Sequence, residues 1–193
     1  MIIWINGAFG SGKTQVAYEL HKRIDNSFVF DPEEAGFYIS SNMPYALSKD
    51  DFQDYPMWRS FNANMLEEIN KEFQGIIICP MTVTNSDYLY EITKNLNIKH
   101  YSLIASAQTI EKRLRRRGEK KNAWAFKQIE RCVDALSDEA FNDHIQTDNL
   151  SIDDVVEEIA RRSKITLHPD TRSTLKKKMD RIFVWKKHIR IFG

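Results

Sequence analysis

Short apolar runs alternate along the chain with longer stretches in which apolar residues recur every three or four positions. The apolar runs predict buried strands at residues 2–5, 28–30, 76–79, 100–104 and 144–146. The helical periodicity predicts helices at residues 12–24, 56–73, 87–96, 109–117, 123–136 and 151–162. Strands that alternate with helices pair in parallel and need helices on both faces. The pattern therefore predicts an α/β fold with a doubly wound parallel sheet of about five strands.

A glycine-rich segment follows the first apolar run. It reads Gly7-Ala8-Phe9-Gly10-Ser11-Gly12-Lys13-Thr14 and matches the phosphate-binding pattern G-x-x-x-x-G-K-[ST] in full. Glycines let the backbone wrap closely around phosphate oxygens, and the amides at a helix N-terminus carry partial positive charge. Lys13 is placed to hold the β- and γ-phosphates, and the Thr14 hydroxyl to ligate Mg²⁺. Residues 7–14 are therefore predicted to form a P-loop that binds ATP and Mg²⁺.

Asp31 is the candidate carboxylate of the site. No aspartate ends the 76–79 strand, where Pro80 follows Cys79, so a carboxylate for the magnesium must come from elsewhere. Asp31 follows the second strand, and the ligand crevice of an open α/β sheet lies at the carboxyl ends of its strands. We therefore expect Asp31 to serve the metal, to contact substrate or to act as a base. A turn residue or helix cap before Pro32 is the alternative.

A basic segment separates two of the predicted helices. Arg113, Arg115, Arg116 and Arg117 precede Gly118, and Lys120 and Lys121 follow it. The segment is typical of a lid, at about 115–124, that closes over phosphates. In a kinase, Arg113 and Arg117 would then stabilise charge on the transferred phosphoryl group, and Arg117 would also contact the nucleotide. The alternative is a solvated basic surface on two helices.

Two further places in the chain are candidates for ligand contact. Asp148 follows the last strand, where it would lie beside the nucleotide base or else belong to the start of a helix. The segment 31–60 mixes acids with aromatic residues, which suits a polar ligand with flat or sugar-like parts. Asp31, Asp51 and Arg59 are its candidate substrate contacts. A partly exposed acidic insertion is the alternative for this segment.

Charge is distributed unevenly along the 193 residues. The net charge is +1, but residues 1–172 carry 21 basic and 26 acidic residues, whereas residues 173–193 carry seven basic residues and one acidic residue. A mildly acidic body argues against general nucleic-acid binding. We therefore divide the chain into a P-loop domain, 1–168, and a basic C-terminal helix, 169–193.

The C-terminal helix is predicted to be amphipathic. Its apolar side would carry Leu175, Met179, Ile182, Phe183, Trp185 and Ile189. Basic amphipathic helices with Trp and Phe suit an anionic membrane surface, so residues 173–193 are a candidate membrane-surface element. Packing of the helix on its own body is the alternative. Two cysteines and no apolar stretch of about 18 residues favour a cytoplasmic protein, either free or peripheral at the inner face of the cell membrane.

Several segments resemble one family. Residues 1–14, 49–59, 127–133, 143–152 and 188–191 are similar to the corresponding segments of the bacterial tunicamycin-resistance ATP-binding proteins. The resemblance spans essentially the whole chain. It implies a small-kinase-like P-loop protein that binds ATP, protects against tunicamycin and sits at the membrane through its C-terminal helix. Gly12, Lys13 and Thr14 carry over as nucleotide-site residues.

Three functions remain open from the sequence. The first is a kinase that moves the γ-phosphoryl group of Mg-ATP to a hydroxyl of tunicamycin or a related small molecule, with Asp31 orienting or deprotonating the acceptor. The second is a binding protein that uses ATP to sequester the antibiotic at the membrane without transfer. The third is a metabolite kinase with an unrelated substrate.

Overall fold

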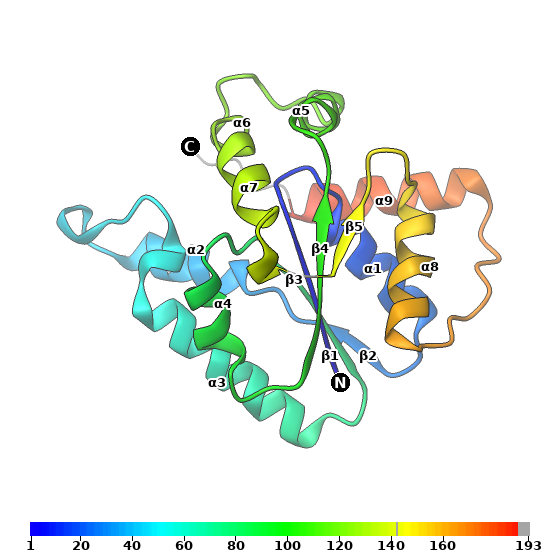
Figure 1. Ribbon diagram of the computed structural model, residues 1–193, viewed down its shortest axis with the longest axis horizontal. Helices are drawn as coiled ribbons and strands as arrows, with labels where there is room; N and C mark the ends of the chain where they lie inside the picture. The colour runs from blue at the N-terminus through cyan, green and yellow to red at the C-terminus, as the bar shows by residue number, and fades with distance from the viewer. Residues whose placement is uncertain (142, 189–193) are drawn as a thin grey trace.

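Five parallel strands form the centre of the molecule. The structure is a computed structural model, and it describes residues 1–141 and 143–188. The strands are β1 (Ile2–Gly7), β2 (Ser27–Val29), β3 (Ile76–Pro80), β4 (Ile98–Ile104) and β5 (His144–Gln146). They lie in the order β2-β3-β1-β4-β5, and every pairing is parallel (Figure 1). The predicted doubly wound sheet is confirmed, and β5 has the predicted bounds.

Helices fill the intervals between the strands. They are α1 (Lys13–Arg23), α2 (Glu33–Asn42), α3 (Pro56–Glu72), α4 (Ser86–Thr93), α5 (Ala107–Arg116), α6 (Trp124–Lys127), α7 (Ile129–Leu136), α8 (Ile152–Ser163) and α9 (Thr174–His188), with 3-10 turns η1 (Tyr45–Leu47), η2 (Phe52–Asp54) and η3 (Glu139–Phe141). The prediction of one continuous helix over 123–136 was wrong. Gln128 adopts a turn conformation, with φ −92° and ψ −6°, and separates α6 from α7.

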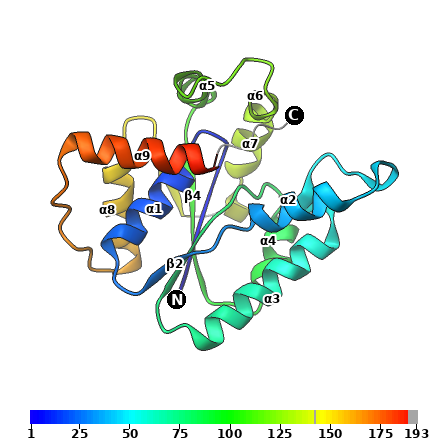
Figure 2. The same cartoon turned by 180° about the vertical axis from the view of Figure 1, so that it is seen from behind.

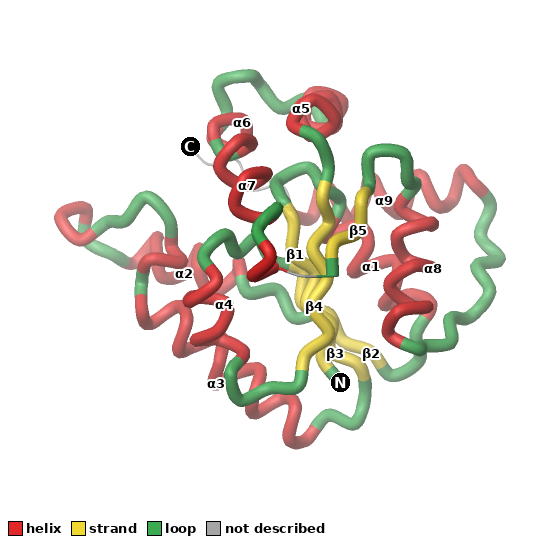
Figure 3. Tube along the Cα trace, in the orientation of Figure 1, coloured by secondary structure: helices red, strands yellow, loops and turns green. Residues whose placement is uncertain are grey.

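The sheet has a hydrophobic core on each face. All six residues of β1 are buried, and Ile2 to Ile5 alternate between the two cores. Ile2 and Trp4 join the core formed with α3, α4, α5 and α7, whereas Ile3 and Ile5 join the core formed with α1 and α8. Figure 3 shows the strands between these two groups of helices. This two-sided burial explains why β1 is a continuous apolar run rather than an alternating pattern.

Helix α9 forms an additional layer outside α1 (Figure 2). The sequence pattern placed its start near residue 169, but the helix begins at Thr174. Residues before it make a turn in which the Asp170 carboxylate accepts hydrogen bonds from the backbone and guanidinium of Arg172. None of the described helices combines the length and apolar composition that a membrane span requires.

Candidate nucleotide and acceptor site

The P-loop is a tight backbone turn between β1 and α1. Gly10 and Gly12 adopt φ values of +85° and +105°, which favour glycine. A Cβ at Gly7 would lie 2.5 Å from the Ser11 hydroxyl oxygen, so the loop also lacks room for a side chain there. Within the described residues, no side chain caps the start of α1, and the buried Ser11 hydroxyl has no hydrogen-bond partner. A closely wound loop with unused donors at a helix N-terminus fits a phosphate group.

Lys13 is a buried cation at the start of α1. Its Nζ donates a hydrogen bond to the Ala8 carbonyl, at 3.2 Å, and lies 5.5 Å from the centre of the Phe9 ring. Burial lowers the pKa of Lys13 to about 8. A buried ammonium is costly unless an anion compensates it, so the residue fits the polyphosphate of a nucleotide. Thr14 follows in the first helical turn, where its hydroxyl would serve a phosphate-bound Mg²⁺.

Two buried polar residues that the sequence analysis did not identify hold the loop in place. The Asn6 side-chain amide donates to the Val83 carbonyl at 2.8 Å and accepts from the Val83 amide at 3.0 Å. The Thr82 hydroxyl donates to the Gly7 carbonyl at 2.8 Å. These bonds fasten the end of β1 to the segment after β3. The only signal in the sequence was the polar residue Asn6 at the end of an apolar strand, and this signal does not indicate which residue it contacts.

Asp31 follows β2 and lies close to charged residues of both the P-loop helix and α9. Its carboxylate accepts a hydrogen bond from the Glu33 amide at 3.1 Å, and one oxygen lies 4.0 Å from His188 Nε2. Burial raises the pKa of Asp31, while the Glu33 amide, His188 and Lys13 oppose that rise. The residue therefore contributes to the first turn of α2 and is electrostatically coupled to Lys13. A carboxylate with a raised pKa is suited to accept a proton.

The predicted lid arginines differ in their surroundings. Arg113 donates to the Thr147 hydroxyl at 3.0 Å and to the Ser11 carbonyl at 3.4 Å, so it ties α5 to the P-loop and to the end of β5. Arg117 ends α5, makes no ion pair with a described residue, and has its pKa lowered by burial. Across the loop, the Trp124 ring meets the Phe9 ring edge to face, with centroids 4.9 Å apart. The P-loop is thus contacted by Arg113, just before the 115–124 segment, and by Trp124 at the end of that segment.

Asp148 is occupied by the start of α5. Its carboxylate accepts hydrogen bonds from the hydroxyls of Ser106 and Thr109, each at 2.6 Å, and from the Ser106 amide. These bonds lower the pKa of Asp148. The carboxylate fixes the loop after β5 to the loop after β4. A capping box forms the start of α8, with Ser151 and Asp154 bonded to each other's backbone amides.

The two remaining predicted substrate residues hold the segment between β2 and α3. Asp51 caps η2 and lies 3.3 Å from the Arg131 guanidinium. Arg59 is buried, donates to Glu91 at 2.5 Å and to the Gln53 carbonyl at 2.6 Å, and lies 4.1 Å from the centre of the Tyr88 ring. The structure therefore gives each a fixed position with polar partners from other elements.

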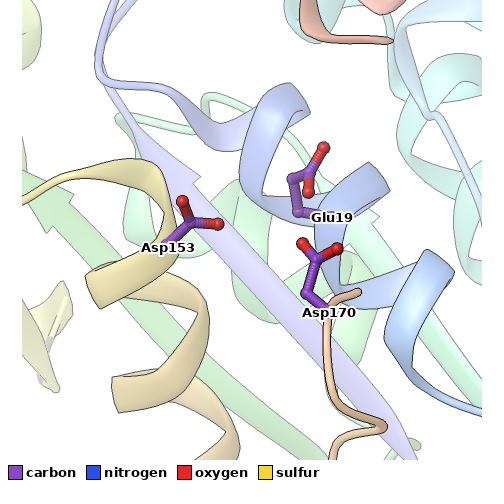
Figure 4. Close-up of side chains that lie close together, drawn as sticks. All are labelled: Glu19, Asp153 and Asp170. Carbon is purple, nitrogen blue, oxygen red and sulfur yellow. The ribbon is translucent and has the colours of Figure 1, made fainter. Parts of the chain in front are cut away.

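Three carboxylates converge beside α1. Glu19, Asp153 and Asp170 come from α1, α8 and the turn before α9, and their oxygens lie within 4.8 Å of one another (Figure 4). Three cations match them: Arg172 bonds to Glu19 and Asp170, Lys177 to Asp170 at 3.0 Å, and Arg181 to Asp153 at 2.8 Å. The cluster is therefore an ion-pair network that docks α9 on the body.

Solved structures with the same fold define the class of protein. A sugar kinase from Janibacter sp. HTCC2649 matches with a TM-score of 0.63 and 15% identity, over 86% of this chain and 95% of that one. A shikimate kinase from Bacteroides thetaiotaomicron matches with a TM-score of 0.55 and 15% identity, over 86% and 99%. The fold and the P-loop together define a protein with the architecture of small P-loop kinases.

A third structure gives the family. The tunicamycin resistance protein of Deinococcus radiodurans is 34% identical, with a TM-score of 0.74, over 88% of this chain and 98% of that one. The chain belongs to the family of tunicamycin resistance proteins, as its sequence segments predicted. Comparison with protein-family models and with curated proteins gives no match.

Proposed function

We propose that this protein binds Mg-ATP at the P-loop and transfers the γ-phosphoryl group to a hydroxyl of tunicamycin or a similar small molecule. The proposal is carried by two residues near the P-loop. Lys13 is a buried cation that makes no ion pair in the described chain, and Asp31, which interacts with it electrostatically, has a raised pKa. Membership of a tunicamycin resistance family with a small-kinase fold supports the choice of acceptor.

The proposed residues have distinct tasks. The P-loop amides, Lys13 and Thr14 hold the phosphates and Mg²⁺, which supply the electrostatic stabilisation that phosphoryl transfer requires. Transfer forms a bond between the acceptor oxygen and the γ-phosphorus, breaks the bond to the bridging oxygen of the leaving ADP, and passes the hydroxyl proton to Asp31. Arg117, which makes no ion pair with a described residue, would neutralise charge on the transferred group.

Mass spectrometry of tunicamycin after incubation with the protein and Mg-ATP tests the proposal. A product heavier by one phosphoryl group is expected with the wild type and is expected to disappear with Lys13→Ala. Lys94→Ala is the matched control, because this exposed lysine ends α4. An unmodified antibiotic, together with confirmed ATP binding, would refute transfer to tunicamycin.

Binding and sequestration at the membrane is the second candidate function, and the exposed side of α9 favours it. Leu175 and Phe183 are 69% and 71% exposed, and Met179 and Ile182 are also exposed. Lys178, Lys186 and Lys187 lie on the same helix and are exposed too. An apolar stripe flanked by lysines suits a membrane that contains anionic lipids. The last part of the predicted membrane element, residues 189–193, lies outside the described residues.

Flotation with vesicles containing anionic lipid tests this second function. The double variant Leu175→Glu, Phe183→Glu should lose vesicle binding, because it places two anions on the stripe. Tyr45→Glu is the matched control, since Tyr45 is 97% exposed and lies on η1, away from α9. Equal flotation of all three proteins would refute a membrane role for the stripe.

A further inference from the structure

A cavity of about 670 Å³ lies between α1, the end of α5, α8 and α9. This volume is in the usual range of small-molecule sites. One wall is Gln15, which directly follows Thr14 in the first turn of α1, and another is Arg117 at the end of α5. The cavity therefore begins where the P-loop ends. A nucleotide whose phosphates lie on the loop must place its sugar and base in space that adjoins the loop.

Helix α9 supplies most of the outer wall. Lys178, Ile182 and Trp185 line the cavity from this helix, and the Gln15 side-chain amide donates to the Arg181 carbonyl at 2.9 Å. The ion-pair network at Glu19 holds the helix in this position. Helix α9, which follows the P-loop domain in sequence, thus forms a wall of the cavity next to the P-loop.

The lining suits an anion that carries a flat group. Arg116, Arg117 and Lys178 line the cavity and make no ion pair within the described residues, although Glu119 acts on Arg117 electrostatically from a distance. Trp185 adds an aromatic surface and Ile182 an aliphatic one. Aromatic side chains stack on nucleic-acid bases with little dependence on which base is present. An aromatic ring can stack on the base of a nucleotide, and neighbouring positive charge can contact its phosphates, so the cavity suits a nucleotide.

We propose that α9 forms a wall of the nucleoside subsite, with Trp185 contacting the base of ATP. This inference rests on the proposed binding of ATP at the P-loop and adds a contact that comes from the C-terminal helix. It has a thermodynamic consequence: ATP binds the form with docked α9 more tightly, so nucleotide binding and docking of α9 favour each other.

Competition between ATP and inorganic tripolyphosphate separates the nucleoside subsite from the P-loop. Both probes, with Mg²⁺, occupy the phosphate site, but only ATP reaches Trp185. Trp185→Ala should weaken ATP binding about tenfold and leave tripolyphosphate binding unchanged. Trp185→Phe keeps an aromatic ring and should recover most of the affinity. Phe183→Ala is the matched control on the same helix, because Phe183 is exposed and does not line the cavity.

Each possible result decides the matter. An unchanged ratio of ATP to tripolyphosphate affinity in Trp185→Ala would overturn the inference. This holds if neither probe binds more weakly, and also if both are weakened equally, which would indicate a structural role for Trp185. Lys13→Ala should weaken both probes, because it acts at the phosphates. A wild-type protein that binds neither probe would overturn the proposed function together with this inference, whereas a protein that binds both equally well would overturn the inference alone.

Discussion

Raising the pH from 7 to 9 should weaken ATP binding about tenfold, because Lys13 loses its proton over that interval. Burial lowers the pKa of Lys13 from 10.5 to about 8. Phosphates beside the ammonium favour its charged form, so the pKa in the complex is higher. The free protein is then roughly nine-tenths protonated at Lys13 at pH 7 and roughly one-tenth at pH 9. Affinity falls in that proportion, which corresponds to about 1.4 kcal/mol.

Calorimetry at pH 7, 8 and 9 measures this effect directly. At pH 8, binding should take up about half a proton per ATP, detected as a dependence of the heat on the buffer's ionisation enthalpy. Cys79 and Cys132 do not confuse the measurement, because burial raises the pKa of both thiols. Lys13→Arg provides the control, since arginine stays charged throughout the range. An affinity that is independent of pH, with no proton uptake, would refute the assignment of a lowered pKa to Lys13.

Four further substitutions test the energetics of the fold and the site. Lys13→Met should stabilise the protein by about 3 kcal/mol below pH 8, because it removes a buried charge whose pKa is lowered. This gain in stability should shrink as the pH rises toward 10.5. Urea unfolding at pH 7 and pH 10 measures the change. Asp31→Asn should abolish phosphoryl transfer, read by mass spectrometry, while ATP binding persists; retained turnover would exclude Asp31 as the base. Arg172→Ala should cost about 3 kcal/mol, since it leaves the buried Glu19 carboxylate without its main partner. Arg161→Ala, which removes an exposed ion pair, should cost less than about 1 kcal/mol in the same unfolding assay, and equal losses would contradict the proposed network.

The central sheet and the P-loop were predictable from the sequence because their signals are local. Each strand core is a short apolar run between turn residues, and the motif from Gly7 to Thr14 is contiguous. The break at Gln128 was not predictable, because apolar positions continue on both sides of it. Local pattern thus identified the strands and most of the helices, but not α2 and not every boundary.

The surroundings of the candidate site residues depend on contacts between distant parts of the chain. Arg59 was identified by its place among aromatic and acidic residues, but its partner Glu91 lies 32 positions further along. Asn6 and Thr82 were not identified, because their bonds bridge positions more than 70 residues apart. His188 comes to within 4.0 Å of Asp31 only because α9 folds back over α1. The spacing of residues along the chain does not predict such long-range contacts.

Helix α9 is packed on the body and also keeps an exposed apolar surface. The sequence left two interpretations of this helix open, contact with a membrane surface and packing on its own body. In the structure, the helix docks through ion pairs of Arg172, Lys177 and Arg181 and buries Val184. Leu175, Met179 and Phe183 stay exposed. Docking therefore leaves part of the apolar surface of α9 exposed. A membrane that binds the stripe can do so without detaching Trp185 from the cavity, so the proposed nucleoside contact and the proposed membrane contact are compatible in one molecule.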